Sequence, residues 1–312
     1  MNNALFLRLA LGCCAVAVAV ALACAPASAR IVEVHWTPGA EGDAPATREQ
    51  ARAAAFRDAV LAEAADLLPG ALSAPRQELL RQHLLPRAAD YVQSYAEAAA
   101  PEAALAAPQG ATALRLDVTV NRPALRRTLQ RMGVYYTVRA PRDYDLALEG
   151  EAGASLDEIA RLQELSGLRV RRGVQPLVAL SRDAQDGSWT GRLDQDGQSW
   201  TARGAALADV WFELLGHYFS RPGAEAGVVD QVALTVRGWS AADGVKAFDA
   251  ELGSWDGLVE GRVLTRVLLL PEGVAGVWTV RTLDPEALGR RLAQTLPPRG
   301  LAWEGPGARP AP

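Results

Sequence analysis

The sequence has few of the residues that carry the common chemistries of enzymes and metal sites. Its 312 residues contain three cysteines, three histidines and one lysine, with a formal net charge of −4. His35, His83 and His217 are far apart and lack the ligand spacing of a zinc site. No G-x-S-x-G elbow, S-x-x-K pair or Walker-type loop occurs. Slight acidity argues against a nucleic-acid binder, because neutralising phosphates needs a basic surface. We therefore expect no metal, no cofactor and no nucleic-acid partner.

The first residues have the pattern of a secretory signal peptide. Met1–Arg8 is short and positively charged, Leu9–Ala23 is an uninterrupted run of apolar and small residues, and Pro26–Ala29 ends in an A-x-A pattern. The apolar run is shorter than the roughly 20 residues that span a bilayer. We expect cleavage after Ala29 and a periplasmic location, with a lipoprotein anchored at Cys24 or an uncleaved membrane anchor as the alternatives.

Cysteine is absent after this leader. Cys13, Cys14 and Cys24 all fall inside the segment that we expect to be removed. The mature chain would therefore contain no disulfide and no thiol nucleophile. No later segment approaches 18 consecutive apolar residues, so the sequence predicts a water-soluble protein after residue 29.

The length allows about two domains or three small ones, and the pattern favours three modules. Residues 30–140 predict a strand, two helices, two strands and a further helix, with an inserted loop between 96 and 112. The capping box Thr47-x-x-Gln50 opens the first helix, Ser73 precedes the second, and Asn121 can cap the last. Strand 113–120 alternates apolar and polar residues, which is typical of a half-buried strand.

Residues 224–304 repeat this plan in the order βαββαβ. A strand at 228–237 precedes the cap Ser240-x-x-Asp243, a hairpin joins 258–270 to 274–282, and Asp284 caps a last helix before a short strand. This order is that of a ferredoxin-like split unit. Residues 121–129 and 284–292 share apolar, alanine and arginine positions, which supports a duplication.

Residues 141–223 form a mixed or antiparallel α+β middle domain between these two units. Ser155-x-x-Glu158 is expected to cap a helix, and Asp186-Gly187 and Asp196-Gly197 favour tight hairpin turns between three strands. The predicted fold class is thus α+β, with tandem small modules and ferredoxin-like units on either side of the middle domain. The tail, 305–312, is predicted to be disordered.

Aromatic residues of the middle domain give the best candidate for a binding surface. Trp189, Trp200 and Trp211 are close in sequence, with Tyr218 nearby, and such rings can stack on glycan rings or anchor a partner protein. Core packing between the hairpin and the following helix is the interpretation that we favour. Arginine pairs such as Arg126-Arg127 are expected on solvated faces, because acidic residues are interspersed with them.

Two stretches of the chain resemble a known family. The alanine-rich helix Arg52–Val60 is followed by Ala89-Asp90-Tyr91-Val92-Gln93-Ser94-Tyr95, and Val236-Arg237-Gly238-Trp239-Ser240 leads towards Leu283–Leu288. These stretches resemble a set of uncharacterised bacterial envelope proteins, defined only by a domain of unknown function. A more distant likeness is to the amino-terminal domain of flagellar assembly protein T, a periplasmic component around the flagellar basal body. The resemblance implies an envelope protein and carries over no catalytic residue.

Together these observations predict a non-enzymatic periplasmic protein. It would act as a scaffold or accessory factor in envelope assembly, flagellar or outer-membrane, with envelope or outer-membrane proteins as partners. The alternative is a module that binds peptidoglycan or another glycan through the middle-domain tryptophans. A third interpretation is an enzyme that uses carboxylates alone, as many glycosidases do.

Overall fold

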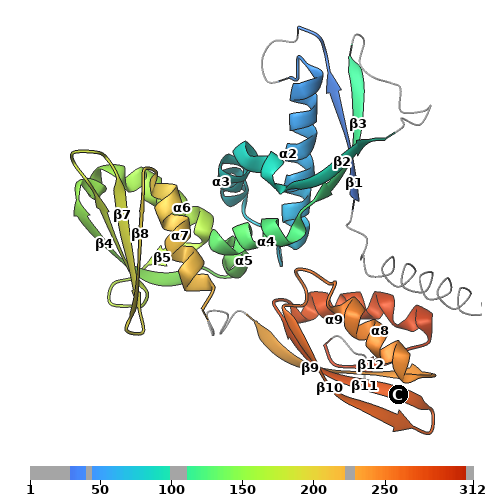
Figure 1. Ribbon diagram of the computed structural model, residues 1–312. Coiled ribbons are helices and arrows are strands. Elements are labelled where there is room, and N and C mark those ends of the chain that lie inside the picture. The colour runs from blue at the N-terminus through green and yellow to red at the C-terminus, as the bar shows by residue number, and fades with distance from the viewer. Residues whose placement is uncertain (1–28, 40–43, 99–110, 222–228, 307–312) are drawn as a thin grey trace, which may run out of the picture. The chain divides into compact units, whose positions relative to one another are not determined.

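The computed structural model describes residues 29–39, 44–98, 111–221 and 229–306. Within these residues the chain is an α+β protein with three separate sheets and eight α-helices (Figure 1). It divides into two compact units, Met1–Glu63 with Leu84–Leu125 and Ala64–His83 with Arg126–Pro312. Residues 1–28 of the predicted signal peptide, 307–312 of the predicted tail and most of the predicted loop lie outside the described residues.

The first unit contains an antiparallel sheet of three strands in the order β1-β3-β2. The predicted alternation of β3 is confirmed, because Leu114, Leu116, Val118 and Val120 are buried while the residues between them are partly exposed. Helix α2 begins in this unit and buries small residues such as Ala51 and Ala55. The elements are β1 (Ala29–Trp36), α2 (Arg48–Leu67), the 3₁₀ helix η1 (Leu85–Tyr91), β2 (Val92–Glu97), β3 (Thr112–Val120) and α4 (Arg122–Arg131).

The second unit contains a mixed sheet of five strands in the order β5-β4-β6-β7-β8. Strand β4 is parallel to both β5 and β6, whereas β6, β7 and β8 are antiparallel. Both predicted hairpins form, and Asp196 and Gly197 have the positive φ angles, 51° and 77°, that a tight turn needs. The elements are α3 (Ala74–Leu84), α5 (Val134–Thr137), β4 (Arg142–Gly150), η3 (Glu151–Ser155), α6 (Leu156–Ser166), β5 (Leu168–Val170), β6 (Leu177–Arg182), β7 (Trp189–Gln195), β8 (Gln198–Gly204) and α7 (Leu207–Phe219).

The same unit ends in an antiparallel sheet of four strands in the order β10-β11-β9-β12. Helices α8 and α9 cover one face of this sheet (Figure 1). Phe248 of α8, Trp278 of β11 and Leu288 of α9 belong to the continuous apolar core between these helices and the sheet. The elements are β9 (Asp230–Trp239), α8 (Ala242–Leu252), β10 (Gly261–Leu270), β11 (Gly273–Thr282), α9 (Pro285–Thr295), η4 (Pro297–Arg299) and β12 (Ala302–Glu304).

The first and last sheets have corresponding strand orders. The order β1-β3-β2 corresponds to β9-β11-β10, and α4 follows β3 as α9 follows β11. The similar segments 121–129 and 284–292 therefore fall on corresponding helices. The first sheet differs in having, among the described residues, no strand in the place that β12 takes beside β9.

Helix starts agree with the sequence only in part. Asn121 and Asp284 accept hydrogen bonds from the backbone N–H groups three residues later, at 3.1 and 2.9 Å, so both predicted caps are confirmed. Thr47 likewise accepts from the N–H of Gln50. The cap predicted at Ser155 is confirmed in position only, because Ser155 is the N-cap residue of α6 but its side chain makes no cap hydrogen bond. The cap predicted at Ser240 is wrong, because α8 begins one residue later than predicted, with Ala241 as its N-cap.

Candidate functional site

The predicted aromatic surface lies mostly inside the five-stranded module. Trp189, Trp211 and Tyr218 are buried, and the indole N–H of Trp211 donates to Ser166 Oγ at 3.0 Å. Trp200 is half-buried and stacks on His217, with their ring centroids 6.1 Å apart. The structure therefore brings three of the four rings into the core, as the packing interpretation expects. Buried rings cannot stack on a glycan, which leaves Trp200 as the one ring of the four with an accessible face.

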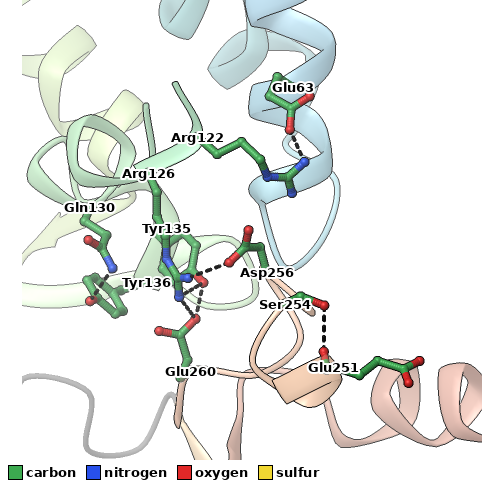
Figure 2. Close-up of polar contacts among 10 residues, drawn as sticks. All are labelled: Glu63, Arg122, Arg126, Gln130, Tyr135, Tyr136, Glu251, Ser254, Asp256 and Glu260. Atoms are coloured by element: carbon green, nitrogen blue, oxygen red, sulfur yellow. Dashed lines mark hydrogen bonds and ion pairs between the residues drawn. The ribbon is translucent and has the colours of Figure 1, made fainter. Parts of the chain in front are cut away.

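A cluster of charged and phenolic groups surrounds Arg126 in the second unit. Its guanidinium donates to Glu260 at 2.7 Å, to Asp256 at 3.3 Å and to the hydroxyl of Tyr135 at 2.9 Å. The Tyr135 hydroxyl in turn donates to Glu260 (Figure 2). The hydroxyl of the neighbouring Tyr136 receives a hydrogen bond from Gln130 at 3.2 Å. Arg126 and Tyr135 thus share the carboxylate of Glu260 as a hydrogen-bond acceptor.

The electrostatics of this cluster favour fixed charges over proton transfer. Burial raises the pKa of Tyr135 far above its usual range, and the negative charge of Glu260 adds to the shift. Burial opposes the charge on Arg126, but Tyr135, Glu260 and Asp256 outweigh it and raise the pKa of Arg126. Tyr135 therefore stays a neutral hydrogen-bond donor at physiological pH. The cluster is an ion pair between Arg126 and Glu260 in which the Tyr135 hydroxyl is hydrogen-bonded to both side chains, and this arrangement suits a structural contact.

Sequence reasoning missed this role of Arg126. Arg126 was expected on a solvated face together with Arg127, yet its side chain is 21% exposed whereas Arg127 is exposed. Its acidic partners Asp256 and Glu260 are 130 and 134 residues away in sequence. Local spacing carries no signal for a contact of that range, so the expectation of a solvated face for Arg126 is wrong.

A second buried carboxylate lies in the first unit. Glu63, on α2, has a side chain only 1% exposed and lies 3.2 Å from the Arg30 guanidinium. Arg122, at the start of α4, donates to its other oxygen (Figure 2). Burying a carboxylate is costly unless cations and hydrogen bonds compensate its charge. Both arginines supply this compensation, so Glu63 joins β1, α2 and α4.

A small pocket opens between α3 and α6. Its volume is about 230 Å³, and His83 lies at its wall with an edge-to-face contact to Phe212 at 5.3 Å. Burial lowers the pKa of His83, so the imidazole is mostly neutral at neutral pH. Ligand pockets for drug-sized molecules usually span about 300–1,000 Å³, which makes this one small. The lining residues are Leu79, Gln82, His83, Glu158, Arg161 and Leu162.

Exposed apolar side chains gather on the edges of the sheets. Eight large apolar residues of the described chain are exposed, and all but Leu156 of α6 lie on a strand at the edge of a sheet. Each of the three sheets has at least one, on β1, β2, β5 or β10. The seven are Ile31, Tyr95, Val170, Val263, Val267, Leu268 and Leu269. Edge strands also have unpaired backbone groups, so these positions combine apolar surface with hydrogen-bonding capacity.

Two kinds of feature are absent from the residues that the structure describes. No helix among them is long and apolar enough to cross a membrane. No group of three or more His, Cys, Asp or Glu side chains among them is placed to hold a metal ion.

Comparison of the chain with protein-family models, curated proteins and solved structures found no match. The resemblance to bacterial envelope proteins therefore stays a prediction from the sequence.

Proposed function

We propose that this chain is a non-enzymatic protein of the bacterial periplasm that acts as a scaffold or accessory factor in envelope assembly. Its partners would be envelope proteins, at the outer membrane or around the flagellar basal body. The signal-peptide pattern and the resemblance to envelope proteins support the location. Cleavage after Ala29 would release a chain that begins at Arg30, the second residue of β1.

The observation that carries the proposal is the placement of exposed apolar side chains on edge strands. Proteins that are not meant to associate usually protect sheet edges with charge, proline or short strands. Here seven of the eight exposed large apolar residues lie on such edges, distributed over all three sheets. An edge of this kind can bind an extended segment of another protein through main-chain hydrogen bonds, while its side chains give specificity.

The fold adds a second argument. In the last module the connection β9-α8-β10-β11-α9-β12 and the order β10-β11-β9-β12 support a ferredoxin-like split unit. The order β1-β3-β2 in the first sheet corresponds to β9-β11-β10, which supports a version of the same unit without the fourth strand among the described residues. Small modules in tandem present several sheet edges on one chain, which suits a protein that holds partners together.

The test is crosslinking in the native bacterium, followed by affinity purification through a carboxy-terminal tag and mass spectrometry. The expected result is recovery of outer-membrane or basal-body proteins, with a mature amino terminus at Arg30. A lipid on Cys24 would support the same function from a membrane anchor.

Edge variants make this test specific. Ile31→Arg and Val170→Arg place a charge on exposed positions of β1 and β5, which are 57% and 45% exposed, so folding should be unaffected. Leu156→Arg is the matched control on a helix, at 56% exposure. We expect the edge variants to lose envelope partners and the control to keep them. Equal recovery by all three variants, or recovery of cytoplasmic proteins alone, would contradict the proposal.

A further inference from the structure

Strand β10 has four of the seven exposed large apolar residues that lie on sheet edges. It forms one end of the order β10-β11-β9-β12 and pairs with β11 alone in the described chain. Leu269 is 82% exposed, the highest value among the exposed large apolar residues, and Val263, Val267 and Leu268 are exposed at 61%, 45% and 39%. The free edge of β10 therefore combines unpaired backbone groups with four accessible apolar side chains.

These side chains point to both faces of the sheet. Leu268 lies opposite Ala275, whereas Val267 and Leu269 lie opposite Gly276 and Val274. Directly opposed residues of an antiparallel pair share a face, and successive residues alternate between faces. A strand added beside β10 would therefore cover Leu268 on one face and Val267 with Leu269 on the other.

Two opposite charges lie at equal distances along the chain on either side of Leu269. Arg266 precedes Leu269 by three residues and Glu272 follows it by three, with only apolar residues between them. Both are exposed, and neither has an ion-pair partner among the described residues. Arg262, by contrast, is already bound to Asp249 at 3.2 Å. The segment 266–272 thus has a positive end, an apolar centre and a negative end.

A segment with this pattern is complementary to itself in the antiparallel orientation. We infer that β10 pairs with β10 of a second copy of this chain, antiparallel and centred on Leu269. Leu269 then faces the partner's Leu269, Leu268 faces the partner's Leu270, and the long side chain of Arg266 lies near the partner's Glu272, which is in the turn that follows β10. The two four-stranded sheets become one sheet of eight strands across a two-fold axis.

Charge complementarity favours the second copy over another occupant. In the two-fold arrangement each copy supplies the opposite charge that the other needs, at both ends of the apolar segment. Pairing across the two-fold axis also covers residues 268–270, the end of β10 with its most exposed apolar side chain, in both copies. The self-pairing leaves the edges β1, β2 and β5 available for other proteins.

The first measurement is the mass of the purified exported protein by sedimentation velocity over a range of concentrations. We expect a dimer that dissociates on dilution. Leu269→Arg should weaken dimerisation at least about 100-fold, because it places two cations at the two-fold axis in an apolar contact. Leu156→Arg is the control and should leave the mass unchanged. A wild-type protein that is monomeric throughout, or a dimer indifferent to Leu269→Arg, would overturn the inference.

A charge exchange tests the register. Arg266→Glu and Glu272→Arg each replace attraction by repulsion at two symmetric places, so each should weaken the dimer about tenfold. The double variant Arg266→Glu with Glu272→Arg restores opposite charges across the axis and should recover affinity to within about threefold. Single variants without effect, or a double variant weaker than either single one, would overturn the pairing centred on Leu269.

Site-specific photocrosslinking in cells distinguishes the occupants. A photoreactive residue in place of Leu268 should produce a covalent dimer of this chain, and a product with a different protein at that position would overturn self-pairing. The inference rests on the same edge strands as the proposed function, but the mass measurement needs no envelope partner. A monomeric protein that still recovers envelope proteins refutes only the dimer, and a dimer that recovers none refutes only the envelope role.

Discussion

The indole N–H of Trp278 donates a hydrogen bond to the carboxylate of Asp249, with 3.1 Å between Nε1 and Oδ1. Trp278 is fully buried on β11, and Asp249 lies on α8, so one carboxylate joins the helix to the centre of the last sheet. The same carboxylate binds Arg262 of β10. This contact therefore connects the packing of the core to the edge strand.

Replacing Asp249 by alanine should lower the free energy of unfolding by about 2 kcal/mol, because the buried indole N–H loses its acceptor. Asp249→Asn keeps an acceptor oxygen and should cost less. Lys246→Ala, on the exposed side of the same helix, should stay within about 0.5 kcal/mol of wild type. Urea unfolding followed by tryptophan fluorescence gives all three values. Equal losses for alanine and asparagine would show that the hydrogen bond contributes little.

Glu63 offers a comparison between a buried and an exposed ion pair. Glu63→Gln removes the charge that Arg30 and Arg122 surround, so we expect a loss of about 3 kcal/mol in the free energy of unfolding. Glu286→Gln removes the partner of Arg290 on the surface of α9, where Glu286 is 90% exposed, and should have almost no effect. Denaturant titration of both variants measures the difference. Two equal and small losses would refute a compensating role for the arginines.

Gly133 has a left-handed backbone in a crowded place. Its φ is +76°, and a β-carbon there would lie 2.7 Å from a ring carbon of Phe219. Gly133→Ala should therefore destabilise the protein by about 3 kcal/mol, from backbone strain together with the clash. Gly173 has nearly the same φ, +75°, but nothing within 4 Å of the same position, so Gly173→Ala should cost only about 1 kcal/mol. Thermal or urea unfolding of the pair isolates the clash.

The raised pKa of Tyr144 predicts how the free energy of unfolding changes at high pH. Burial raises its pKa to about 12, against the opposing hydrogen bond from Gln163, whereas an unfolded tyrosine titrates near 10. The unfolded chain therefore releases this proton first. The contribution of the Tyr144 hydroxyl to the free energy of unfolding is complete below pH 10 and is lost as pH rises from 10 towards 12.

At pH 11 this effect lowers the free energy of unfolding by about 1 kcal/mol relative to pH 8. Tyr144→Phe has no proton to release there, so its stability should fall less over the same interval. Urea unfolding of both proteins at the two pH values measures the difference. Tyr95→Phe is the control, since Tyr95 is 46% exposed. An identical pH dependence for Tyr144→Phe and wild type would contradict the prediction.

Local patterns predicted much of the fold. The α+β class, the alternation of β3 and the hairpin at Asp196-Gly197 follow from spacing and turn chemistry within a few residues. Helix caps were predicted only in part, because the Ser240 motif is present but the helix begins after Ala241. A cap motif states which residue can accept the hydrogen bond, whereas the surrounding packing decides where the helix begins.

The candidate sites depended on contacts that no local pattern encodes. Arg126 meets Glu260 across 134 residues, and Glu63 meets Arg122 across 59. The β10 edge is apparent in the sequence as an apolar segment, 267–270, but its exposure depends on its place at the end of the sheet. Neither strand order nor pairing partners can be read from a two-residue period.

The strand order of the first sheet also determines when that sheet can form. β1 and β2 each pair with β3 and not with each other, and β3 is the last of the three in the chain. A chain that emerges with its amino terminus first therefore offers two strands without a partner until Thr112–Val120 is available. The whole sheet then closes around a single late segment, so its assembly is governed by long-range contacts.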